Sequence, residues 1–189
     1  MKGFRFTLPS PQPVPEPPAS TWVERIQGHY GSKLRPVPLP QLPLEEGTRR
    51  FLEHPGLPAP MFGNGPFGVF VLHDPFVRTF RQQTLLVLGQ VFTGGQLVVH
   101  LQDGHISVLK HNTLLFLNTH LQHFVVFHLL YERLHVHAPL DVRVPFEVQL
   151  QIRAERLERQ FSEVDRPALT GQHGWRRCLQ GVLETSEEA

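Results

Sequence analysis

The chain has 189 residues, of which 40% are apolar and 19% are charged, with 18 basic and 17 acidic side chains and a net charge of +1. This composition excludes a wholly disordered chain, and the balanced charge gives no strong attraction to nucleic acid or to anionic membranes. The single cysteine, Cys178, excludes an intrachain disulfide.

The ends of the chain are predicted to lie outside one domain that spans residues 21–184. Residues 1–20 form a Pro-rich tail, because residues 9–18 hold six prolines, which favour an extended polyproline II conformation. We expect a stiff tail there rather than a ligand for a proline-binding groove. Residues 185–189 are predicted to fray. The segment after Met1 lacks the apolar core of a signal peptide and no stretch has the length of a membrane span, so we expect a cytoplasmic protein.

Two short helices are predicted before the central part of the chain. The first covers residues 21–30, and the second covers residues 44–54 and turns Phe51 and Leu52 inward. Between them, four prolines in residues 36–43 predict an extended connector.

Residues 61–117 are predicted to form a β-sheet. The expected strands, separated by short connections, cover residues 69–72, 77–80, 85–88, 97–101, 106–110 and 116–117. Asp74-Pro75 is predicted to be a turn, Gly89 a strand end, and Asp103-Gly104 a hairpin turn. Short connections between neighbouring strands make the predicted sheet antiparallel.

The C-terminal half is predicted to be mostly helical. Thr119 to Gln122 has the pattern of a capping box before a helix that runs to about residue 134. A second helix opens near Pro145, and a last one covers about residues 175–183. The predicted fold class is therefore α+β: an antiparallel sheet with helices packed around it.

Twelve histidines raise the question of a metal site. None of the spacings is the i,i+4 pair of a zinc protease, and no cysteine pair supports a structural zinc. We therefore expect surface or half-buried imidazoles and neither metal nor cofactor. The histidines close enough in sequence to be candidate metal ligands are His100, His105, His120, His123, His128, His135 and His137.

The sequence contains no complete set of catalytic parts. Cys178 adjoins Arg176 and Arg177, but its place in an apolar helix pattern predicts a core thiol. Glu155 and Glu158 alternate with arginines, which predicts a solvated face rather than an acid–base pair. The glycine pairs at residues 63–65 and 94–95 do not continue into a phosphate-binding motif. No enzyme activity is predicted.

A nucleic-acid interface is also not expected. Phe76, Arg78 and Phe80 combine aromatic and basic side chains, as such interfaces do. Alternation along a strand places these three on one face, so a buried strand with edge arginines explains them equally well.

Several segments, in this order, resemble the SUKH superfamily of bacterial immunity proteins, in particular its fourth group. They are residues 48–58, 86–89, 97–101 with Asp103-Gly104, 116–121 followed by Phe124, and the Trp175 helix with Leu179 and Leu183 after residues 167–169. The resemblance covers roughly residues 44–184. His100 stands where family members often have Asp, and His120 where they commonly have a small polar residue.

The resemblance implies a non-enzymatic protein that neutralises a toxin, often a nuclease or deaminase, by direct binding. Immunity proteins against basic nucleases are often acidic, whereas this chain is nearly neutral. A general interaction or scaffold domain of the same fold, and a histidine-based metalloprotein, therefore stay open as alternatives. The sequence names neither the interface residues nor the oligomeric state.

Overall fold

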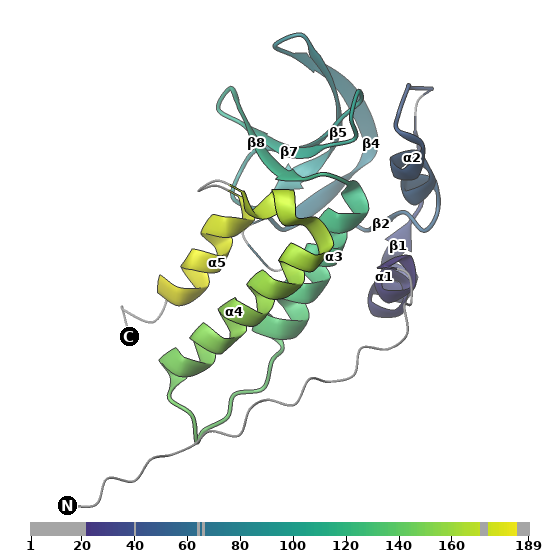
Figure 1. Cartoon of the computed structure of the whole chain (residues 1–189). Coiled ribbons are helices and arrows are strands. Elements are labelled where there is room, and N and C mark those ends of the chain that lie inside the picture. Colours follow the sequence, from purple (N-terminus) through teal and green to yellow (C-terminus); the bar gives the residue numbers. More distant parts are fainter. Residues whose placement is uncertain (1–21, 40, 64, 66, 171–173, 185–189) are drawn as a thin grey trace, which may run out of the picture.

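The computed structural model describes residues 22–39, 41–63, 65, 67–170 and 174–184. It confirms the predicted α+β class and the helical character of the C-terminal part (Figure 1). A curled antiparallel sheet lies at one end of the molecule, and three long helices extend away from it (Figure 1). The predicted Pro-rich tail and the C-terminal end at residues 185–189 lie outside the described residues.

Both N-terminal helices are confirmed, and the strands that precede and follow the second helix pair as a small antiparallel sheet. The elements are α1 (Trp22–Tyr30), a 3₁₀ turn (Gly31–Lys33), β1 (Leu34–Arg35), α2 (Glu46–Glu53) and β2 (Leu57–Pro58). The Glu45 carboxylate caps α2 by accepting hydrogen bonds from the amides of Gly47 and Thr48, both at 2.7 Å. Phe51 and Leu52 are buried, as predicted.

The main sheet has six strands in the order of the chain, and all neighbouring pairs are antiparallel. They are β3 (Met61–Phe62), β4 (Val69–Phe80), β5 (Gln83–Val91), β6 (Gln96–His100), β7 (Ile106–Lys110) and β8 (Thr113–Asn118). The turn at Asp103-Gly104 connects β6 and β7, as predicted, and Gly104 has a φ of +72°.

Two predicted strand breaks are wrong. Asp74-Pro75 is not a turn, because β4 continues through it by means of an irregularity in register between Val71 and Phe76. Such a bulge accommodates Pro75, which has no N–H for the ladder. Gly89 does not end β5 either; it pairs with Val71, and a Cβ there would lie 2.5 Å from the Phe70 carbonyl oxygen. Glycine at residue 89 therefore lets β4 approach closely.

The two faces of the sheet carry separate apolar clusters. The larger cluster packs against the helices and includes Leu86, Leu97 and Val99. The smaller cluster contains the residues that alternate with them, and Leu72 and Leu114 pack against it. Its members are Phe80, Leu85, Val87, Val98 and Leu109. The curl of the sheet buries this second cluster on the face that none of the described helices covers (Figure 1).

The C-terminal helices occupy the predicted places. They are α3 (Leu121–Tyr131), a π-helical turn (Glu132–Val136), α4 (Phe146–Asp165), a 3₁₀ turn (Arg166–Leu169) and α5 (Trp175–Glu184). α3 lies between α1, α2, α4 and β8, and nine of its eleven residues are buried. A helix that is apolar on all sides is typical of such a central position.

The predicted capping box before α3 is wrong. α3 begins at Leu121, and its N-cap residue, His120, makes no side-chain capping bond. The Thr119 amide instead donates to the Asp165 carboxylate at 2.8 Å. The capping-box pattern predicts that the Gln122 side chain accepts from the Thr119 amide. Asp165, at the C-terminal end of α4, accepts this hydrogen bond instead.

Candidate protein-interaction site

The histidines that the sequence singles out do not converge. His128 is fully buried in α3, and its ring meets those of Phe62, Phe124 and Trp175 edge-on. Burial lowers the pKa of His128 to about 3, although the backbone of Phe67 favours the protonated form slightly. Neither ring nitrogen has a hydrogen bond of good geometry among the described residues. His128 is therefore a neutral core residue.

The other histidines include two edge-on pairs, His100 with His105 at 6.4 Å between ring centroids and His120 with His123 at 5.1 Å. His100 lies on β6, and its Nε2 is 3.0 Å from the Ser107 hydroxyl, while His105 lies beside Asp103. His123 faces Asp165, and His135 lies against Tyr131. Within the described residues, no three His, Cys, Asp or Glu side chains are placed to hold a metal ion.

A buried polar network joins β8 to the last two helices. Asp165 accepts hydrogen bonds from the Asn118 side chain (3.0 Å) and the Thr119 amide (2.8 Å), and Asn118 accepts one from the Trp175 indole at 2.9 Å. Burial raises the pKa of Asp165, but the contacts from His123, Thr119 and Asn118 outweigh it and hold the pKa below its usual value. This network fixes helices onto the sheet and forms no cleft.

Cys178 is a core thiol, as predicted. It is buried in α5, and burial raises its pKa to about 12. We expect native protein to resist Ellman's reagent at neutral pH, since the reacting species is the thiolate. The control is protein in guanidinium chloride, which should release one equivalent of chromophore per chain. Stoichiometric labelling of native protein within seconds would contradict the buried position.

The carboxylates of α4 lie on a solvated face. Glu158 pairs with Arg176 at 2.6 Å, and Gln151 donates to Glu155 at 3.1 Å. The depression that borders them is shallow and open, and is lined by Glu155, Glu158, Arg159, Ser162 and Glu163. These contacts agree with the solvated face that the sequence predicts for Glu155 and Glu158.

One polar pocket was not predicted. Its volume is about 270 Å³, and its lining includes the ion pair of His29 and Glu132, 2.8 Å apart. Burial raises the pKa of Tyr30 in its wall, and the Glu132 charge adds to this effect. The paired residues are 103 positions apart in the chain, so no local pattern indicated them. Glu132 opens the π-helical turn that follows α3.

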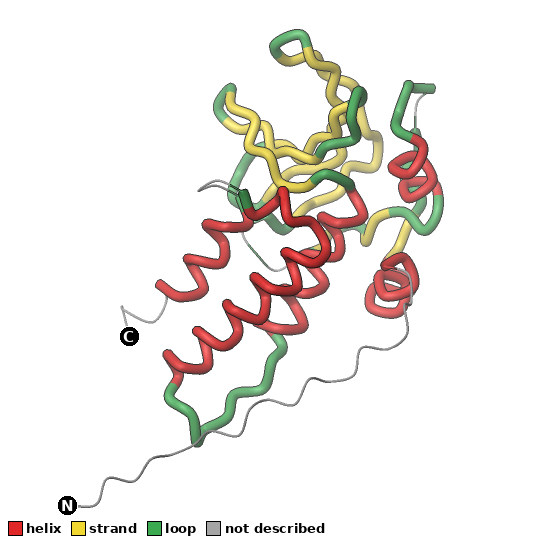
Figure 2. Tube along the Cα trace, viewed as in Figure 1, coloured by secondary structure: helices red, strands yellow, loops and turns green. Residues whose placement is uncertain are grey.

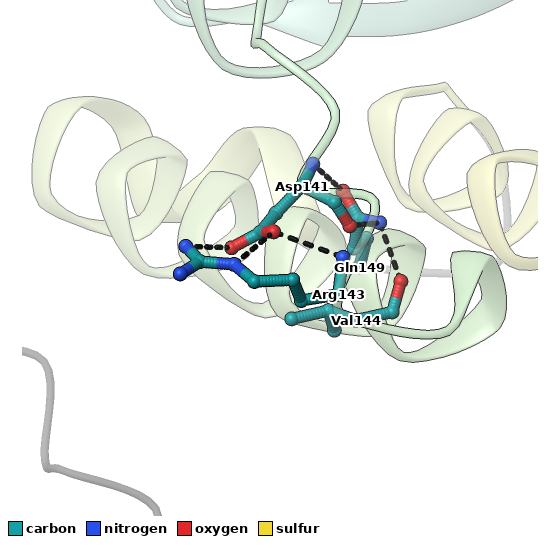
Figure 3. A network of polar contacts seen from close by, with 4 residues as sticks. All are labelled: Asp141, Arg143, Val144 and Gln149. Carbon is teal, nitrogen blue, oxygen red and sulfur yellow. Dashed lines mark hydrogen bonds and ion pairs between the residues drawn. The ribbon is translucent and has the colours of Figure 1, made fainter.

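The connection between α3 and α4 carries an exposed apolar surface. Arg143 binds both oxygens of Asp141, and the Gln149 side chain bonds to the Asp141 backbone and to the Val144 carbonyl (Figure 3). This network orders the loop that leaves Val142 98% and Leu140 61% exposed. The loop lies at the end of the molecule opposite the sheet (Figure 2).

The sheet carries a second exposed surface along β4. The Phe70 and Phe92 rings contact each other with centroids 4.9 Å apart, and both are exposed. Phe76 and Arg78 are exposed farther along β4, so the interpretation of this segment as a buried strand is wrong, and only Phe80 is buried, in the smaller apolar cluster. The predicted common face of residues 76, 78 and 80 agrees with the register, because they pair with residues 87, 85 and 83 of β5.

Among the described residues, no helix combines the length and apolarity that crossing a membrane requires. The profile of the SUKH-4 immunity protein family matches residues 22–182. No curated protein and no solved structure matches the chain. The match includes the main sheet, α1 to α4, α5 as far as residue 182, and both exposed surfaces. The chain belongs to the SUKH-4 immunity protein family.

Proposed function

We propose that this chain neutralises a protein toxin of the nuclease or deaminase type by binding it directly, without catalysis, in the cytoplasm of the cell that makes it. Membership of an immunity protein family carries the proposal. The dispersed histidines, the inert Cys178 and the solvated Glu155 and Glu158 support a binding role over a catalytic one.

The exposed surfaces suit this role. A stable inhibitory complex buries about 1,600 Å² in total, with aromatic and arginine side chains as anchors. Phe70, Phe76 and Arg78 supply such side chains on β4, which is paired with β5 on both sides of its bulge. A rigid binding surface loses little conformational entropy on association.

The test is co-expression of this chain with a nuclease or deaminase toxin domain from a neighbouring gene. We expect cells that carry both genes to grow and cells that carry the toxin alone to stop growing. Affinity purification of a tagged chain should then recover the toxin domain. Growth arrest in the presence of well-expressed, folded chain would contradict the proposal.

A further inference from the structure

We propose, resting on the immunity function above, that the free edge of β4 between Phe76 and Phe80 docks an extended, acidic strand of the protein partner. β4 is an outer strand after its bulge, because β3 pairs only with Val69 and Phe70. The amide of Val71 still donates to the Pro60 carbonyl at 2.8 Å. Beyond that bond, no described strand covers the edge.

The outward backbone groups of this edge follow from the register. In an antiparallel ladder, every second residue directs its N–H and C=O away from its partner strand. Thr79 pairs with Thr84, and the Thr84 carbonyl accepts from the Leu101 amide on the β6 side at 3.0 Å. Thr79 and Val77 are therefore the residues whose backbone groups point to solvent. Both are exposed, so a partner strand can pair with them.

Charge defines the chemistry of that strand. Residues 74–114 contain three Arg or Lys and two Asp; Asp103 pairs with His105, and Asp74 lies in the bulge of β4, before the proposed edge. The three cations bind neutral acceptors: Arg78 the Gln96 side chain at 2.9 Å, Arg81 the Asn112 carbonyl at 3.2 Å, and Lys110 the Thr93 carbonyl. No ion pair between described residues involves them. An acidic strand supplies the carboxylates that this end of the sheet lacks.

A second copy of this chain fits the edge less well. Antiparallel pairing centred on residue 78 would place two Arg78 side chains directly opposite each other, which is destabilising. Shifting the pairing toward the bulge brings in Pro75, which has no N–H to donate. Nucleic acid also fits less well, since Phe80 is buried and Phe76 is the one exposed aromatic ring of residues 76–80 that can stack on a base.

The test uses two synthetic peptides, acetyl-Thr-Val-Glu-Val-Thr-amide and its counterpart with Lys in the central position, titrated into the ¹⁵N-labelled full chain. We expect the Glu peptide to shift the amide resonances of Val77 and Thr79, and the Lys peptide to bind about tenfold more weakly. Arg78→Glu should reverse that preference. Equal binding of both peptides, shifts confined to another surface, or no shifts at millimolar peptide would overturn the proposal.

Matched variants separate the edge from the overall fold. Thr79→Pro removes an outward N–H without removing a bond to β5, and should weaken the Glu peptide about tenfold. Thr79→Val keeps the N–H and should bind like the unmodified chain. An oligothymidylate that shifts the same resonances more strongly than the Glu peptide would assign the surface to nucleic acid and overturn the proposal.

The toxin experiment then distinguishes the two proposals. If the unmodified chain protects cells and Thr79→Pro does not, while Thr79→Val does, both hold. If Thr79→Pro protects as well as Thr79→Val, the edge proposal fails and the immunity function stands. If the unmodified chain fails to protect but binds the Glu peptide at Val77 and Thr79, the immunity function fails alone.

Discussion

Trp175→Ala is expected to lower the free energy of unfolding by about 3–5 kcal/mol, the usual cost of removing a buried indole. The Trp175 side chain is fully buried. Its ring contacts five others, with centroid distances between 5.0 and 6.1 Å, namely those of Phe67, Phe124, Phe127, His128 and Phe161. It therefore connects α5 to α3 and α4, and the substitution leaves a cavity where they meet.

Trp175→Phe is the matched control. It keeps an aromatic ring but loses the indole N–H that donates to Asn118 at 2.9 Å. Leaving a buried acceptor without its donor costs about 1–3 kcal/mol. Urea denaturation followed by circular dichroism measures both variants. A loss below about 1 kcal/mol for Trp175→Ala would contradict the central place of this side chain.

The second large effect is a loss of stability in acid that depends on His128. Its pKa is about 3 in the folded chain, and the ordinary value is 6.5. Because the unfolded chain binds this proton more readily, stability is fully present above pH 6.5 and is lost as the pH falls toward 3. The difference between these two values corresponds to about 4–5 kcal/mol.

His128→Met tests this prediction because methionine is apolar and adapts to irregular cavities. We expect the variant to lose most of the decline in unfolding free energy between pH 6.5 and pH 4, a range above the folded pKa of His128. Burial also lowers the pKa of His100 and His135, so these leave a residual slope in both proteins. Parallel curves for His128→Met and the unmodified chain would show that the imidazole is not buried in its neutral form.

Gly63 shows how closely the chain surrounds that imidazole. Its φ is +80°, and a Cβ at this position would lie 2.3 Å from His128 Nδ1. Both the backbone conformation and the space therefore require glycine. The sequence shows the glycines at residues 63 and 65 but not the helix side chain that comes to lie against the first of them.

The sequence predicts elements well where periodicity and turn chemistry agree. The strand over residues 106–110, the helix that opens after Pro145 and the hairpin at Asp103-Gly104 all occur as predicted. The hairpins at residues 81–82 and 111–112 were not predicted as two-residue turns. Their residues, Arg81-Gln82 and His111-Asn112, have positive φ values without the glycine that usually signals this geometry.

Features that depend on distant residues could not be predicted. The Thr119–Gln122 pattern satisfies the local rule for a capping box, but Asp165 arrives from another helix and takes the Thr119 amide. Likewise, the pairing of His29 with Glu132 depends on how α1 packs beside α3.

Titration of toxin activity against added chain measures most directly whether protection works by binding. The toxin concentration is kept well above the dissociation constant of the complex between toxin and chain. Residual toxin activity should then fall linearly with added chain and reach zero at one chain per toxin. A chain that modified or degraded the toxin would abolish activity far below equivalence, and one that acted as a scaffold would leave it intact. Either of these results would contradict neutralisation by stoichiometric occlusion.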